Sequence, residues 1–237
     1  MNLSNSICVV TGGSAGIGRA IAFALGKRGA RVAICARTPK NVTNNVKELQ
    51  KASVSAVGTA CDVSEPKDVE RFAAFVHQEL GSVDVLVNNA GLGHFVNVEE
   101  MTLEQWDETF AVNLRGVFLM TRAFLPDMRK RKRGDIVNIA SLAGRNPLAG
   151  GAAYSASKHG LLGFSKSLMM EVRKDNIRVT AVCSGSVATP LFRKGKAPAE
   201  HPERKLDPDD VAHAVVAALE VADRAMISEL DIRPTNP

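Results

Sequence analysis

The chain has 237 residues, of which 45% are hydrophobic and 23% charged, and its formal net charge is +5. This length and apolar content suffice for one α/β domain with a sizeable core, so we expect residues 1–237 to form a single domain. Tyrosine and tryptophan occur once each. This scarcity argues against a surface that stacks nucleic-acid bases, and no apolar run is long enough to span a membrane.

Short runs of β-branched residues alternate with amphipathic helical patterns along the whole chain. The predicted strands are 7–11, 31–36, 54–60, 83–89, 134–141, 176–183 and 225–233. The predicted helices are 17–28, 42–52, 68–80, 102–132, 152–175 and 208–222. This alternation is typical of βαβ units and a parallel sheet. Ser64 is the predicted N-cap of the third helix, and Pro126 is expected to kink or interrupt the fourth.

Two further features concern the surroundings of the protein. The four cysteines, Cys8, Cys35, Cys61 and Cys183, show no metal-ligand or CxxC spacing, which predicts buried, reduced thiols in a cytoplasmic protein. The amino-terminal residues lack a signal-peptide pattern, so we expect a soluble and unprocessed protein.

Basic residues gather at 129–133 (RKRKR) and at 192–205. Such runs are most often solvated faces. The more specific alternative is that they bind an acidic substrate or a carrier protein. A nucleic-acid contact at 129–133 is disfavoured because the run has no aromatic neighbours.

A glycine-rich turn, TGGSAGIG, follows the first predicted strand and precedes the first helix. Its residues Gly12, Gly16 and Gly18 allow positive φ and close approach of a ligand to the backbone. The helix that follows would direct free N–H groups at a phosphate. A strand–turn–helix of this kind indicates nucleotide binding, although a purely structural turn is the alternative.

The ends of the next strands indicate which nucleotide is bound. NAD-binding proteins commonly carry a carboxylate at the end of the second strand, whereas a basic residue suits the 2′-phosphate of NADP. This strand leads into Arg37 without a carboxylate, so NADP(H) is favoured over NAD(H); the alternative is a surface arginine. Asp62 and Val63 could border an adenine ring, and 88–91 (NNAG) could approach the middle of the cofactor. Both segments could also be ordinary turns, in which Asp, Asn and Gly are common for reasons of local backbone geometry.

Tyr154, the only tyrosine, precedes Lys158 by four positions in a predicted helix, so the two side chains share a face. A phenol with its ordinary pKa of about 10 is a poor acid or base near neutrality. A neighbouring ammonium would favour the phenolate, and the hydroxyl of Ser141 could hold a substrate oxygen beside it. On spacing alone, most such pairs are structural.

The motifs in order, TGGSAGIG, CDV, NNAG, Asn113 in VNLRG, Ser141 and YSASK, resemble the short-chain dehydrogenases/reductases over essentially the whole chain. The resemblance implies a three-layer, doubly wound Rossmann-like fold with a seven-stranded parallel sheet. It implies hydride transfer between NADP(H) and a carbonyl or alcohol carbon, with no metal. The implied cofactor contacts are Gly12, Ser14, Gly16, Ile17, Gly18, Arg37, Asp62, Val63, Asn89, Ala90, Gly91, Tyr154, Lys158, Val187 and Thr189.

The resemblance also implies roles at the reaction centre. Tyr154 would be the general acid in reduction and the base in oxidation, and Lys158 would lower its pKa and bind the nicotinamide ribose. Ser141 would hydrogen-bond the substrate oxygen. Asn113 would hold a water that links Lys158 to solvent, the alternative being a polar contact inside a helix. Homodimers or homotetramers, formed through the two long helices, are expected.

The chain departs from the family pattern at two places. Ser184 stands before Gly185 where many relatives have proline, although Thr189 is retained to contact the carboxamide. The carboxyl end, ISELDIRPTNP, lacks the DGG-like signature usual in 3-oxoacyl-carrier-protein reductases, which the chain otherwise resembles.

Because the rest of the chain resembles 3-oxoacyl-carrier-protein reductases, a 3-oxoacyl thioester is the first candidate substrate, and an acyl-carrier protein is a candidate partner. A small 3-hydroxy acid, a polyol or another ketone is the alternative, and a non-catalytic NADP sensor is an alternative of another class. The loop 141–153 and a lid at 188–207 are expected to line the pocket. Their apolar side chains are Leu142, Leu148, Leu191 and Phe192. Arg145 could contact an anion, but plain solvent exposure is favoured for it.

Overall fold

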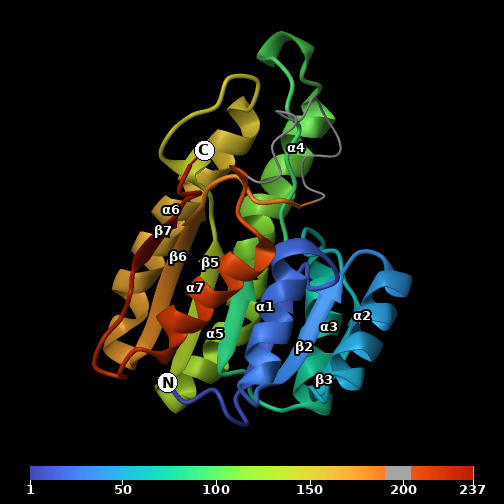
Figure 1. Cartoon of the computed structure of the whole chain (residues 1–237), viewed down its shortest axis with the longest axis vertical. Helices are drawn as coiled ribbons and strands as arrows, with labels where there is room; N and C mark the ends of the chain where they lie inside the picture. Colours follow the sequence, from blue (N-terminus) through green and yellow to red (C-terminus); the bar gives the residue numbers. More distant parts are fainter. Residues whose placement is uncertain (190–203, 237) are drawn as a thin grey trace.

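Seven parallel strands form one sheet in the computed structural model, which describes residues 1–189 and 204–236 (Figure 1). The strands are β1 (Ile7–Thr11), β2 (Arg31–Ala36), β3 (Ala56–Ala60), β4 (Val85–Asn88), β5 (Gly134–Ile139), β6 (Ile177–Ser184) and β7 (Glu229–Ile232). Their order is β3-β2-β1-β4-β5-β6-β7. The chain therefore starts near the middle, runs to one edge and then crosses to the other. This confirms the predicted doubly wound parallel sheet.

Helices cover both faces of the sheet and complete three layers (Figure 1). On one face lie α1 (Gly16–Lys27), α2 (Pro39–Lys51) and α7 (Pro208–Glu220); on the other lie α3 (Pro66–Glu79), α5 (Gly116–Arg131) and α6 (Ala152–Val172). Alternation along β1 feeds both cores, because Cys8 and Val10 pack with the first group while Ile7 and Val9 pack with the second. The short helix α4 (Leu103–Phe110) precedes α5.

The structure corrects the predicted fourth helix. The segment 102–132 is divided into α4, a π-helical turn at Ala111–Arg115 and α5. Pro126 does not interrupt α5, which continues through it to Arg131. Phe124 and Met128, on either side of this proline, are fully buried, and their packing keeps the segment helical. Upstream, the backbone stays helical through the π turn, with right-handed helical dihedral angles at Phe110, Ala111, Arg115 and Gly116, so this turn is a local widening of one helical segment.

Ser64 is not the N-cap of α3. The capping position is occupied by Glu65, which makes no side-chain capping bond and precedes Pro66. The Ser64 hydroxyl instead donates to the Asp62 carboxylate at 2.6 Å, and its backbone N–H donates to the same oxygen at 2.9 Å. Asp62 and Ser64 thus form an Asx-type turn in the loop between β3 and α3.

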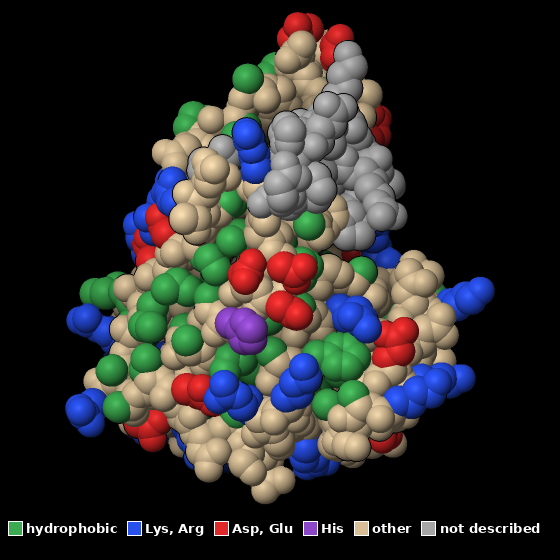
Figure 2. Space-filling model, in the orientation of Figure 1, with side chains coloured by type: hydrophobic (Ala, Val, Ile, Leu, Met, Phe, Trp, Pro, Cys, Tyr) green, Lys and Arg blue, Asp and Glu red, His purple; other side chains and the backbone are tan. Residues whose placement is uncertain are grey.

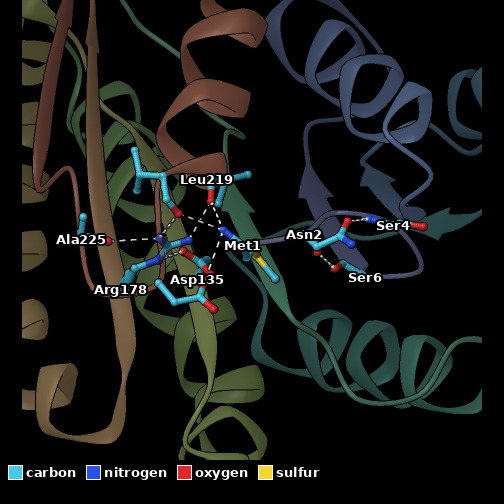
Figure 3. Close-up of polar contacts among 10 residues, drawn as sticks. Met1, Asn2, Ser4, Ser6, Asp135, Arg178, Leu219 and Ala225 are labelled. Carbon is cyan, nitrogen blue, oxygen red and sulfur yellow. Dashed lines mark hydrogen bonds and ion pairs between the residues drawn. The ribbon is translucent and has the colours of Figure 1, made fainter.

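A buried polar cluster lies at the amino-terminal edge of the sheet (Figure 3). Arg178 at the start of β6 donates to Asp135 of β5 at 2.6 Å and to the Leu219 carbonyl at 2.8 Å. The amino group of Met1 also donates to that carbonyl, at 2.6 Å. These contacts satisfy carbonyls at the end of α7 and join it to the sheet, at the edge opposite to the carboxyl ends of the strands.

The cysteines belong to the core, whereas the basic run 129–133 lies at the surface. All four cysteines are free and buried. Within 129–133, Arg129 pairs with Asp175 and Arg131 pairs with Asp84. On the face drawn in Figure 2, basic side chains are interspersed with acidic ones. Over the described ranges, no helix has the length and apolar character that a membrane crossing needs, and no cluster of potential metal ligands is found.

Candidate active site

The glycine turn joins β1 to α1 at the carboxyl edge of the sheet. Gly12 has φ +64° and Gly16 has φ +50°, which is strained for other residues. A Cβ on Gly18 would collide with both the Gly12 carbonyl oxygen and the side-chain amide nitrogen of Asn89. The residue before α1, Ala15, makes no side-chain capping bond. The first N–H groups of the helix are therefore free to bind an anion.

The segment after β4 is tied to this turn. The Thr11 hydroxyl accepts hydrogen bonds from the backbone N–H groups of Asn89 and Ala90, both at 3.0 Å. The Asn89 side chain donates to the Thr11 carbonyl at 2.9 Å. Because β1 and β4 are neighbours in the sheet, residues far apart in the sequence form one rigid wall.

A cavity of about 430 Å³ opens in front of this wall. It is lined by eleven of the predicted site residues: Gly12, Gly16, Ile17, Asn89, Ala90, Gly91, Ser141, Tyr154, Lys158, Val187 and Thr189. Leu142, Ala143 and Leu148 of the loop 141–153 also line it, as expected, and so do Ser184 and Gly185, where the chain departs from the family pattern. The lining residues that the sequence did not single out are Ala15, Ile139, Ala140 and Ser186. The structure thus brings the glycine turn and the Tyr154–Lys158 pair to one cavity.

Tyr154 and Lys158 stand on the first turns of α6 and are almost fully buried, with exposures of 6% and 4%. The Lys158 ammonium donates to the Ile139 carbonyl at the end of β5, at 2.8 Å, and lies 5.7 Å from the centre of the Tyr154 ring. Ser141 follows β5; its hydroxyl accepts a hydrogen bond from the Ala143 N–H at 3.1 Å and is near enough to Tyr154 to act on the pKa of the phenol. The end of β5 therefore positions both partners of the tyrosine.

Burial governs the charges of this pair. It raises the pKa of Tyr154 above its ordinary value, and the Ser141 hydroxyl acts in the opposite direction. Burial also lowers the pKa of Lys158 to about 8. The direction for Tyr154 is opposite to the one expected from a neighbouring ammonium, because removal of the phenol from water disfavours its anion. In this structure Tyr154 is a protonated acid at neutral pH.

Asn113 lies in the π-helical turn and is completely buried. Its amide donates to the Leu92 carbonyl at 2.8 Å and to the Ser157 hydroxyl at 3.0 Å, and its oxygen accepts from the Leu92 N–H at 2.9 Å. It stands behind Gly91, which lines the cavity. Asn113 therefore links the segment after β4 to α6, as expected of a polar contact inside a helix; its role with water stays a prediction.

The other predicted cofactor residues lie outside the lining of this cavity, within the described part of the chain: Ser14, Gly18, Arg37, Asp62 and Val63. Gly18 acts through the close packing of the turn. Arg37 pairs with Glu108 of α4, with Nη1 3.1 Å from Oε1. This ion pair could not be read from the sequence, since the two residues are 71 positions apart.

Arg145 is exposed, as favoured, but its guanidinium is paired with carboxylates. It pairs with Glu229 and with Asp231 of β7, the latter at 3.1 Å, which ties the loop after Ser141 to the edge strand. Phe95 was missed by sequence reasoning; its ring lies 5.4 Å from that of Tyr154. It follows β4 in an irregular segment, where no periodicity marks a functional side chain. Leu191, Phe192 and most of the expected lid lie outside the described residues.

Comparison with known proteins places this geometry in context. A family model described as short chain dehydrogenase matches residues 6–200. A putative ketoacyl reductase from Streptomyces coelicolor is 43% identical over 189 residues, covering 79% of this chain and 72% of that protein.

Two solved structures are also similar. A variant of actinorhodin polyketide ketoreductase with NADPH has a TM-score of 0.91 at 36% identity, covering 99% of this chain and 97% of that one. An alcohol dehydrogenase from Thermococcus sibiricus complexed with 5-hydroxy-NADP has a TM-score of 0.90 at 31% identity, covering 98% and 97%.

Proposed function

Because the chain belongs to the short-chain dehydrogenase family, and is therefore an oxidoreductase, we propose that it transfers a hydride between NADP(H) and a carbonyl or alcohol carbon of a small molecule. The observation that carries this proposal is the single cavity that contains both the glycine turn and the residues Ser141, Tyr154 and Lys158. The cavity volume of about 430 Å³ is in the range of small-molecule sites.

The turn meets the requirements of a dinucleotide. A Cβ at Gly12 or Gly18 would collide with neighbouring atoms, and the first N–H groups of α1 have no side-chain cap, so they can bind a pyrophosphate. Similar chains have been solved with NADPH and with 5-hydroxy-NADP, and NADP(H) is the cofactor of this chain. Arg37 is the proposed partner of the 2′-phosphate and supports a preference for NADP over NAD.

The residues of the chain would handle the substrate oxygen and the proton. The cofactor, when bound, supplies or accepts the hydride. Tyr154 is the proposed general acid in reduction and general base in oxidation, and the Ser141 hydroxyl beside it is the proposed donor to the substrate oxygen. Lys158 would orient the nicotinamide ribose, and Asn113 would keep α6 and the segment after β4 in register.

A 3-oxoacyl thioester is the proposed substrate. The relative from Streptomyces coelicolor is named a putative ketoacyl reductase, and a structure that matches almost the full chain is a polyketide ketoreductase. The apolar side chains of Leu142 and Leu148 at the cavity suit an acyl chain. The similarity to an alcohol dehydrogenase favours a small alcohol, polyol or 3-hydroxy acid as the second candidate.

We also propose that the chain works as a homodimer or homotetramer in the cytoplasm. A groove of about 950 Å³ lies along α4–α6, and Phe110, Leu114 and Phe118 line it. Phe118 is 45% exposed and Trp106 of α4 is 41% exposed; a second copy would bury such surface. An acyl-carrier protein is a further proposed partner.

The experiment is a spectrophotometric screen of NADPH oxidation with acetoacetyl thioesters, simple ketones, quinones and sugars, repeated with NADH. Turnover of the thioester with NADPH preferred is the expected result. Preference for NADH would contradict the assignment of Arg37. NADPH binding without turnover of any carbonyl would instead favour a non-catalytic sensor.

A further inference from the structure

Three residues from separate elements meet beside the end of β2. The Glu108 carboxylate of α4 lies 3.1 Å from Nη1 of Arg37 and 2.8 Å from Nε2 of His94. His94 belongs to the segment after β4. The side chains of Arg37 and Glu108 are 55% and 42% exposed, whereas that of His94 is 18% exposed. Glu108 is therefore held from the buried side by His94 and meets Arg37 at the surface.

The position of Arg37 relative to the glycine turn matters for the cofactor. The backbone N–H of Gly13 donates to the carbonyl of Cys35 at 3.1 Å, so the end of β2 is tied to the phosphate-binding turn. Arg37 follows two residues later. A 2′-phosphate held by Arg37 would thus come close to Glu108 as well, because both anions would share one guanidinium.

The Glu108 carboxyl is ionised at neutral pH. The hydrogen bond with His94 is the main cause that holds the pKa of the Glu108 carboxyl below its ordinary value; Arg37 acts in the same direction, and partial burial opposes both. An ionised carboxylate accepts hydrogen bonds but donates none. It would attract a ribose 2′-hydroxyl, which can donate, and repel a phosphate, which carries like charge.

We propose that Glu108 is a cofactor-specificity residue that opposes Arg37, weakens the binding of NADP(H) and thereby narrows the preference over NAD(H). This inference rests on the proposed function, in which Arg37 binds the 2′-phosphate. The carboxylate that sequence reasoning sought at the end of β2 is supplied by α4 instead. His94 fixes its orientation, and the next residue, Phe95, packs against the ring of Tyr154.

The effect of Glu108 on NADPH affinity is expected to be modest. An exposed ion pair contributes little to stability and is screened by salt, so a phosphate can compete for Arg37. The guanidinium also has further N–H donors beside the one that faces Glu108. Removal of the Glu108 charge is expected to tighten NADPH binding by about 3- to 10-fold, as suits one like charge at a partly exposed site.

The test compares Glu108→Gln with wild type by measuring Kd for NADPH and for NADH in fluorescence titrations of the full chain. Glutamine keeps the size of the side chain and removes its charge. The expected result is a lower Kd for NADPH with an equal or higher Kd for NADH. Circular dichroism checks the fold, and Glu108→Ala, for which the same direction is expected, replaces the glutamine variant if that variant does not fold.

Glu104→Gln is the matched control, because Glu104 lies on the same helix and its change removes the same charge. Glu104 lies one helical turn from Glu108, but its side chain is exposed. Because the charge of an exposed group is screened by water and salt, this change is expected to leave the ratio of the two Kd values within about 2-fold of wild type. An equal rise of NADPH preference in Glu104→Gln would overturn the proposal, as would an unchanged ratio in Glu108→Gln.

Arg37→Ala separates this inference from the proposed function. If it weakens NADPH binding while Glu108→Gln leaves the ratio unchanged, only the role of Glu108 is wrong. If Arg37→Ala binds NADPH as wild type does, the 2′-phosphate lies elsewhere, and both the Arg37 assignment and the role of Glu108 are wrong. Hydride transfer itself is tested independently by the carbonyl screen.

Discussion

The two ends of the candidate site are built in opposite ways. At the Tyr154 end, formed by Asn113, Ser141, Tyr154 and Lys158, three of the four side chains are buried, with exposures of 0% to 6%. At the Arg37 end, formed by Arg37 and Glu108, both side chains are at least 42% exposed. Groups removed from water have shifted pKa values and fixed partners, which suits proton transfer. Exposed charges interact weakly, which suits discrimination between similar cofactors.

The largest effect is expected from Tyr154→Phe. This change removes the proposed proton donor and leaves the buried ring, so kcat/KM for carbonyl reduction is expected to fall by about 10²- to 10⁴-fold. Steady-state kinetics with NADPH measures it, and NADPH titration is the control, because Kd is expected to change little. Near-full turnover in this variant would show that the Tyr154 end is not the reaction centre.

Lys158 makes stability depend on pH in a defined direction. Its pKa is about 8 in the folded chain and about 10.4 when unfolded, so between these values the unfolded chain binds more protons and stability rises with pH. Relative to Lys158→Met, wild type is expected to gain roughly 2–3 kcal/mol in free energy of unfolding from pH 7 to pH 10. Denaturant unfolding at several pH values checks this. A difference independent of pH would mean that the ammonium is hydrated.

Asn113→Ala is expected to destabilise the chain by about 2 kcal/mol, because it leaves the partly buried N–H and carbonyl of Leu92 without their partner. Its effect on kcat is expected to exceed its effect on the Kd of NADPH, since Asn113 stands behind the cavity wall. Thermal unfolding and kinetics measure the two. Equal loss of NADPH affinity would place Asn113 in cofactor binding instead.

The smallest effect is expected on the exposed surface near α2. Arg19 and Glu48 pair at 2.8 Å, but their side chains are 47% and 52% exposed. Arg19→Ala is therefore expected to change the free energy of unfolding by less than about 0.5 kcal/mol. A loss of more than about 1 kcal/mol in the free energy of unfolding would contradict the view, drawn from the Tyr154 and Arg37 ends of the site, that exposed charges interact weakly in this protein.

Local patterns were sufficient where a function depends on neighbours in the sequence. The strand, the glycines and the helix of the turn are contiguous, so Gly12, Gly16 and Gly18 could be identified from their spacing. The same is true of Tyr154 and Lys158, which share a helix face because they are four residues apart. By contrast, the π turn at Ala111–Arg115 escaped prediction, since nothing in the helical periodicity marks one extra residue in a turn.

The order of strands and turns along the sequence by itself determined the parallel α/β sheet, the phosphate-type turn and the family to which the chain is similar. Only the tertiary structure decided how residues distant in sequence combine. It placed Arg145 against β7, put Lys158 on the Ile139 carbonyl and brought Glu108 to Arg37. Burial, which also reversed the expected pKa direction of Tyr154, is likewise a property of the packed chain, because desolvation depends on every element that surrounds a side chain.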